Sequence, residues 1–156
     1  MNAYNNTVVI VMADDDEEDR MLTADALRES KLGNDLTTVN DGEELMDYLK
    51  HRGKHAPPAA SPRPGLVFLD LNMPRKDGRE VLREMKSDPL LRCIPVVVLT
   101  TSKAEEDVEG IYNLGANSFI VKPVTFEGLV RTMRVATEYW LQIVQLPAGA
   151  NEFPNG

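Results

Sequence analysis

The sequence of 156 residues has one cysteine, two histidines and no apolar run long enough to cross a membrane. The single cysteine, Cys93, excludes an internal disulfide, fits a reducing compartment and is interpreted as a small hydrophobic residue near a strand start. The N-terminal segment has no basic flank, and acids cut its short apolar run, so it matches neither a signal peptide nor a membrane span. We therefore expect a cytoplasmic protein.

Basic residues are also few. The chain has 17 lysines and arginines against 25 aspartates and glutamates, and a formal net charge of −8. An acidic chain without a basic cluster is repelled by nucleic-acid phosphates and by anionic lipid. Nucleic acids and membranes are therefore poor candidate partners. The length suits one domain with a full core.

Apolar strands and amphipathic helices alternate five times along the chain. The pattern predicts strands at 7–13, 36–39, 66–69, 95–99 and 119–121, and helices at about 18–31, 42–52, 79–87, 104–114 and 126–145. Such buried strands indicate a flavodoxin-like α/β fold, a doubly wound parallel sheet in the order 2-1-3-4-5 with helices on both faces. Residues 1–146 are expected to form this single domain and 147–156 a flexible tail, while the Pro and Ala rich segment 53–64 is expected to be an exposed loop.

Polar residues follow or end four of the predicted strands. They are Asp15 and Asp16, Asp70, Thr100, and Lys122. Because the carboxyl ends of parallel strands meet at one edge of a sheet, these side chains are expected to share a pocket. Three carboxylates this close repel one another unless a cation neutralises them, and oxygen ligands favour Mg²⁺. The other acids of the first run fit an exposed helix start, and Asp70 alone would fit the start of a turn.

These residue types together suit phosphoryl transfer. Aspartate forms an aspartyl phosphate, and a lysine and a hydroxyl can hold the equatorial oxygens of the phosphoryl group. The combination predicts that Asp70 attacks phosphorus in line while Lys122 and Thr100 hold the product. Taken alone, Thr100 would be a strand terminator and Lys122 a surface lysine.

Four motifs resemble, in order and spacing, those of the receiver domain of two-component response regulators: ADDDEEDR, FLDLNMPRKDG, VVVLTTS and GANSFIVKPV. The resemblance covers residues 7 to about 134. It implies a divalent metal, Mg²⁺, bound by Asp15 and Asp16, by Asp70 and by the main-chain carbonyl of Asn72.

The same resemblance implies the signalling roles of the site. Asp70 would be phosphorylated by a sensor histidine kinase, and Thr100 and Lys122 would contact the phosphoryl group. Phe119 matches the aromatic switch position, which is expected to turn inward when Thr100 moves onto the phosphoryl group. A core aromatic at a strand start is the alternative interpretation of Phe119.

A narrower similarity concerns the segments PRKDGREVL, KSDPLLRCIPVVVLTTSKAEEDV and EYWLQIVQLP. They resemble the small single-domain regulators that serve phytochrome-type histidine kinases. This similarity implies a phytochrome-type kinase as partner. The signal would then pass to an unidentified downstream protein or to a histidine phosphotransfer protein.

The final predicted helix is longer than the strands that it covers. Its last apolar residues are expected to extend beyond the sheet and to form a two-fold homodimer interface. The alternative is a helix that folds back over its own sheet. The expected interface residues are Tyr139, Trp140, Ile143 and Val144.

Other functions compete with the signalling assignment. A phosphatase would require a second acid two residues after the nucleophile, where this chain has Asn72, so turnover of external substrates is disfavoured. A flavodoxin-like cofactor binder would need a Gly, Ser and Thr rich phosphate loop where six acids stand. The main alternative is a pseudo-receiver, a protein-binding module that keeps the fold without phosphorylation.

Overall fold

Five parallel strands form one sheet in the computed structural model, which describes residues 8–29, 35–57, 61–101 and 105–147. The strand order is 2-1-3-4-5, so the fold class and strand order predicted from the sequence are confirmed. The strands are β1 (Val9–Ala13), β2 (Asp35–Val39), β3 (Leu66–Leu69), β4 (Val96–Thr100) and β5 (Ser118–Val121).

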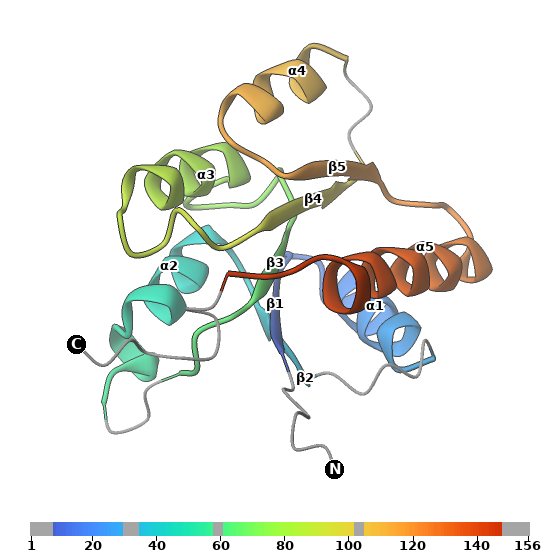
Figure 1. Cartoon of the computed structure of the whole chain (residues 1–156), viewed down its shortest axis with the longest axis horizontal. Helices are drawn as coiled ribbons and strands as arrows, with labels where there is room; N and C mark the ends of the chain where they lie inside the picture. Colours follow the sequence, from blue (N-terminus) through green and yellow to red (C-terminus); the bar gives the residue numbers. More distant parts are fainter. Residues whose placement is uncertain (1–7, 30–34, 58–60, 102–104, 148–156) are drawn as a thin grey trace.

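Helices cover both faces of this sheet (Figure 1). Two helices, α1 (Glu17–Glu29) and α5 (Phe126–Glu138), lie side by side on one face. The other face carries α2 (Gly42–Lys50), α3 (Gly78–Ser87) and α4 (Glu105–Asn113). Among the described helices, none is both long enough and apolar enough to cross a lipid bilayer.

The alternation of side chains along β3 divides the interior into two cores. Leu66 and Phe68 pack with the α1 and α5 side, whereas Val67 and Leu69 pack with the α2 and α3 side. All four are fully buried, since helices cover both faces of the sheet. The uniform apolar run that predicted this strand therefore follows from burial on two sides.

The C-terminal helix changes its winding before it ends. After Glu138, a π-helical turn, η2 (Tyr139–Ile143), replaces the α-helix. The hydroxyl of the buried Thr137 donates to the carbonyl of Met133 at 2.6 Å, and such back-bonding perturbs helices. The helical path thus continues to Ile143, two residues short of the end predicted from the sequence.

The expectation that Trp140 would extend beyond the sheet is wrong. Trp140 is partly buried and packs against the core on the α1 and α5 side, since it follows the buried Met133 by seven residues and so lies on the same face of the helix. Tyr139 and Ile143 remain exposed, and Val144 is partly buried. The tail expected at 147–156 lies, except for its first residue, outside the described residues.

The segment expected to be an exposed loop is partly buried in its second half. Ser61 is 8% exposed, and its hydroxyl donates to the carbonyl of Tyr48 at 2.8 Å. The hydroxyl of Tyr48, a buried side chain, donates in turn to the carbonyl of Pro62 at 2.8 Å. A buried tyrosine hydroxyl requires a partner, and here this requirement ties the loop to α2.

Candidate functional site

Main-chain hydrogen bonds continue the sheet past the ends of its strands and fix the polar residues there. The amide of Asp70 donates to the carbonyl of Ala13 at 3.0 Å, and the amide of Lys122 to that of Thr100 at 2.8 Å. The amide of Asp14 donates to the carbonyl of Val39 at 3.2 Å. These bonds bring the residues after β1, β3 and β5 to one edge of the sheet, beside the last residue of β4.

Three carboxylates meet at this edge. Ligand oxygens of Asp14, Asp15 and Asp70 all lie within 4.8 Å of one another. Asp14 is 1% exposed, whereas Asp15 is open to solvent. An all-carboxylate set with one exposed member suits a hard divalent cation that keeps water ligands. The residues present therefore fit the Mg²⁺ that the sequence predicted.

The pair of acids next to β1 differs by one position from the expected pair. The sequence predicted Asp15 and Asp16, but the structure places Asp14 in the cluster and Asp16 outside it. Asp16 is exposed and caps α1, since its Oδ1 accepts from the amides of Glu18 at 2.9 Å and Asp19 at 3.2 Å. The reason is that β1 ends at Ala13, so Asp14 is the residue at the buried strand end.

The surroundings of Asp70, the candidate phosphoacceptor, raise the pKa of its carboxyl group. Burial raises the pKa of Asp70, and the nearby charge of Asp14 raises it further. A hydrogen bond with the hydroxyl of Thr100 and the charge of Lys122 act in the opposite direction without cancelling the increase. A cation bound at the cluster would lower the pKa of Asp70 again, because it stabilises the charged carboxylate.

Lys122 lies among these acids with its side chain 8% exposed. Its Nζ is 2.5 Å from Oδ2 of Asp14 and 3.0 Å from Oδ2 of Asp19. Burial lowers the pKa of Lys122, but the hydrogen bonds and charges of these carboxylates outweigh burial, so the net shift is upward. Sequence reasoning missed Asp19, because nothing in an acidic helix start shows which acid faces a distant strand.

The loop between Asp70 and α3 packs closely against main chain. A Cβ placed on Gly42 would lie 2.1 Å from the carbonyl oxygen of Lys76, and one on Gly78 would lie 2.5 Å from that of Asp70. Arg75 takes φ 67 in the same loop, and its guanidinium lies 3.4 Å from Asp41 at the cap of α2. The N-termini of α2 and α3 therefore brace the loop that carries Asp70.

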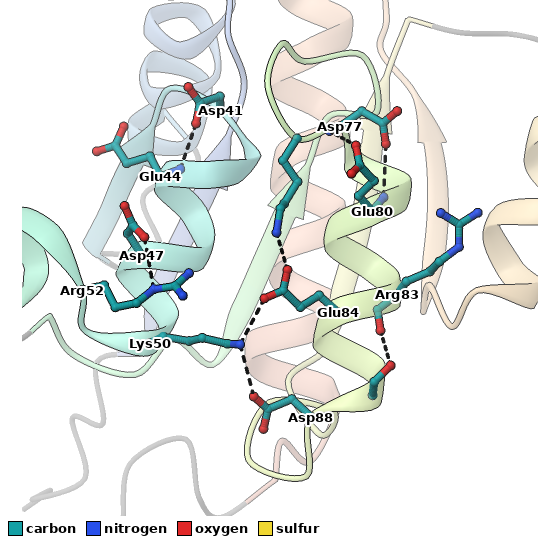
Figure 2. A network of polar contacts seen from close by, with 12 residues as sticks. Asp41, Glu44, Asp47, Lys50, Arg52, Asp77, Glu80, Arg83, Glu84 and Asp88 are labelled. Atoms are coloured by element: carbon teal, nitrogen blue, oxygen red, sulfur yellow. Dashed lines mark hydrogen bonds and ion pairs between the residues drawn. The ribbon is translucent and has the colours of Figure 1, made fainter.

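Ion pairs extend this bracing along the two helices (Figure 2). Lys50 of α2 lies 3.0 Å from Glu84 of α3 and 3.9 Å from Asp88. Glu84 also pairs with Lys76 in the loop, and the hydrogen bond from Lys76 is the main reason that the pKa of Glu84 is lowered. The loop is thus joined to α2 through a shared carboxylate.

Gly42→Ala should destabilise the protein, because its methyl group would collide with the Lys76 carbonyl, which is main chain. We expect a loss of about 2–3 kcal/mol in the free energy of unfolding, in the range for overpacking. Urea denaturation measures it. The matched control is Gly110→Ala in α4, where a Cβ meets nothing within 4 Å and alanine should be neutral or slightly stabilising. Equal stability of the two variants would contradict the close packing.

The two remaining residues of the predicted site lie at its border. Asn72 is exposed in the loop after Asp70, and the role of its carbonyl as a metal ligand stays a prediction. Phe119 is partly buried against the core on the α2 and α3 side, and its amide donates to the hydroxyl of Tyr112 at 3.1 Å. Its role as a switch likewise stays a prediction.

Comparisons with known proteins agree with this geometry. A family model described as the response regulator receiver domain matches residues 10–134. Response regulator Rcp1 of Synechocystis sp. is 42% identical over 130 residues, which make up 83% of this chain and 86% of Rcp1.

Two solved structures resemble the chain over nearly its whole length. The crystal structure of the phosphorylated cyanobacterial phytochrome response regulator RcpA is 43% identical with a TM-score of 0.83. That of the Mn²⁺-bound form of response regulator Rcp1 is 40% identical with a TM-score of 0.82. In both cases the match covers 90% of this chain and 99% of the other.

Proposed function

The chain belongs to the response regulator receiver domain family, and from this premise we propose that it is a single-domain response regulator. It accepts a phosphoryl group from a histidine kinase onto Asp70 and passes the signal on through protein contacts. The observation that carries the proposal is the convergence of three carboxylates, Thr100 and Lys122 at one edge of the sheet.

The chain's own residues account for the steps of the reaction. An oxygen of Asp70 forms a bond to phosphorus while the bond from phosphorus to the donor histidine nitrogen breaks, and the electron pair of that bond leaves with the nitrogen. The hydroxyl of Thr100 is already hydrogen-bonded to the carboxylate of Asp70, so it is placed to donate to a phosphoryl oxygen. Lys122 supplies positive charge beside the same group.

We propose Asp14, Asp15 and Asp70 as the carboxylate ligands of Mg²⁺, with the carbonyl of Asn72 as a further ligand. Bound Mg²⁺ supplies positive charge that offsets the repulsion between these carboxylates and the phosphoryl oxygens. The support is the convergence of these carboxylate oxygens within 4.8 Å of one another. The solved structure of Rcp1 with Mn²⁺ gives a related protein in which a divalent metal is bound.

The proposed phosphodonor is a phytochrome-type sensor histidine kinase. The support is the similarity to RcpA, a cyanobacterial phytochrome response regulator, over 90% of this chain. The receiver of the signal would be a downstream protein or a histidine phosphotransfer protein.

Incubation with Mg²⁺ and acetyl phosphate tests the phosphoacceptor function. Intact-protein mass spectrometry should show the added mass of one phosphoryl group, and EDTA should prevent the addition, because the carboxylate cluster needs a cation. A chain that gains no mass with donor and Mg²⁺ together would contradict the function. That result would favour the pseudo-receiver, which keeps the fold as a binding module.

We also propose a homodimer built on the end of α5 and on η2. A hollow of about 650 Å³ lies between β5 and this helix, with Ile120 and Trp140 in its lining. Val135 and Tyr139, which also line the hollow, are 62% and 50% exposed, and Ile143 at the end of η2 is 69% exposed. Apolar side chains that gather in this way on a surface usually mark an interface.

Val135→Asp should dissociate this dimer, because it places a charge among apolar side chains that the interface would bury. Light scattering at micromolar concentration should give a dimer for the parent and a monomer for the variant. The control is Leu90→Asp, a side chain that is 74% exposed outside this surface and that should leave the dimer intact. A parent protein that is monomeric under these conditions would contradict the proposed homodimer.

A further inference from the structure

Lys122 is held by two carboxylates, of which one lies outside the metal cluster. Asp14 belongs to the cluster, whereas Asp19 comes from the first turn of α1 and its side chain is 36% exposed. Asp70 acts on Lys122 through its charge. Among the described residues, the ion-pair partners of the lysine therefore lie directly after β1 and in α1, and do not include the phosphoacceptor.

The position of Asp19 in its helix makes this contact unusual. Asp19 is the third residue of α1, the position at which a Glu or Gln side chain closes a capping box. The first turn of α3 shows that arrangement, with Glu80 accepting from the amide of Asp77 (Figure 2). In α1 the cap Asp16 accepts from the amide of Asp19, but the carboxylate of Asp19 pairs with Lys122 on β5. The side chain serves a long-range contact in place of the local one.

We propose that Asp19 is a positioning residue that holds Lys122 on the α1 side of the pocket and thereby slows phosphorylation of Asp70. The inference rests on the proposed function and deepens it. An ammonium group has three donors, and two of them already point to Asp14 and Asp19. One donor remains for a phosphoryl oxygen, but the two contacts fix the direction in which it points, so turning it toward the phosphoryl group of Asp70 weakens at least one of them.

Asp19 is the partner that the lysine would release. Asp14 is buried and shared with the metal cluster, whereas Asp19 is partly exposed to water, which can hydrate its carboxylate after release. A partly exposed ion pair changes an equilibrium constant by a factor of about 1.5 to 5. Asp19 thus sets a modest barrier that the arriving phosphoryl group overcomes. The helix that carries Asp19, α1, packs along α5 (Figure 1).

Asp19→Asn should therefore raise the initial rate of phosphorylation by acetyl phosphate with Mg²⁺ about threefold, a value inside the range for such pairs. The matched control is Glu18→Gln, which removes the same charge from the adjacent exposed side chain and should leave the rate unchanged. Asp19→Glu keeps the anion and should restore a rate close to that of the parent. Intact mass measured against time gives all of these rates.

A double-mutant cycle separates positioning from a general effect on the helix. In a Lys122→Ala background, whose slower reaction is followed for longer, Asp19→Asn should have no effect on the rate. Equal rates for Asp19→Asn and Glu18→Gln, or a gain that persists without Lys122, would overturn the inference while leaving the proposed function intact. A parent that gains no phosphoryl mass would overturn both.

Discussion

Asp70→Asn should gain no phosphoryl group under conditions in which the parent gains one. A carboxamide lacks the anionic oxygen that attacks phosphorus, and Asp70 is the carboxylate that is hydrogen-bonded to Thr100. Intact mass after incubation with acetyl phosphate and Mg²⁺ measures the loss. An added phosphoryl mass on the variant would show that another residue is the acceptor.

The same substitution should stabilise the protein when no divalent cation is present. Burial and Asp14 raise the pKa of Asp70 above its ordinary value of 3.8, so the folded state binds this proton more tightly than the unfolded state does. Stability is therefore lost as the pH rises from about 3.8 through the raised pKa, and the penalty persists at neutral pH. Asparagine avoids this penalty.

Thermal unfolding at several pH values checks this expectation. In EDTA the variant should melt above the parent at neutral pH, and the difference should shrink as the pH falls below 3.8. With Mg²⁺ the parent should recover, since a bound cation stabilises the folded state by mass action. A variant that melts below the parent in EDTA would contradict the repulsion between Asp70 and Asp14.

Asp14→Asn should lose most of its affinity for Mg²⁺, whereas Asp16→Asn should keep it. Asp14 contributes a buried carboxylate to the cluster, and Asp16 lies outside it. Loss of a residue that merely supports a metal ligand costs roughly 10–100-fold in affinity, so loss of a ligand should cost at least as much. Calorimetric titration with Mg²⁺ measures the two affinities.

The choice of Asp16→Asn makes the comparison a matched one. Both substitutions remove one negative charge near the same strand end, and asparagine caps a helix about as well as aspartate does. The stability of Asp16→Asn should therefore stay close to that of the parent. A loss of Mg²⁺ affinity in Asp16→Asn comparable with that in Asp14→Asn would restore the pair predicted from the sequence.

The three central strands, β1, β3 and β4, could be predicted because their residues are buried on both faces, and the order of the sheet followed from the regular alternation of strands and helices. A short, wholly apolar run such as Leu66–Leu69 is typical of a strand buried on both faces. The positions of Asp70, Thr100 and Lys122 then follow from the strand ends. The roles of the individual acids in the run at 14–19 were harder to predict. Six consecutive acids look alike in sequence, and only the point at which β1 ends separates the buried Asp14 from the capping Asp16.

The turn at the end of the last helix could not be predicted from the sequence pattern either. Apolar spacing predicted a helix through this region, but spacing does not distinguish an α-helical turn from a π-turn. The hydroxyl of Thr137 bonds inside its own helix, and a π-turn follows. Trp140 shares the core-facing side of the helix with Met133, seven residues earlier, and packs on the core, which its distance along the helix from the strands had not indicated.

The main-chain bonds that continue the sheet past its strands have a consequence for how this scaffold can diverge. The amides of Asp14, Asp70 and Lys122 keep their acceptors whatever side chain each residue carries. Shape and chemistry at this edge are therefore separable, and a descendant of this chain could exchange every reactive group here and still fold. A homologue that cannot be phosphorylated and one that can would share the same backbone, and only their side chains at this edge would differ.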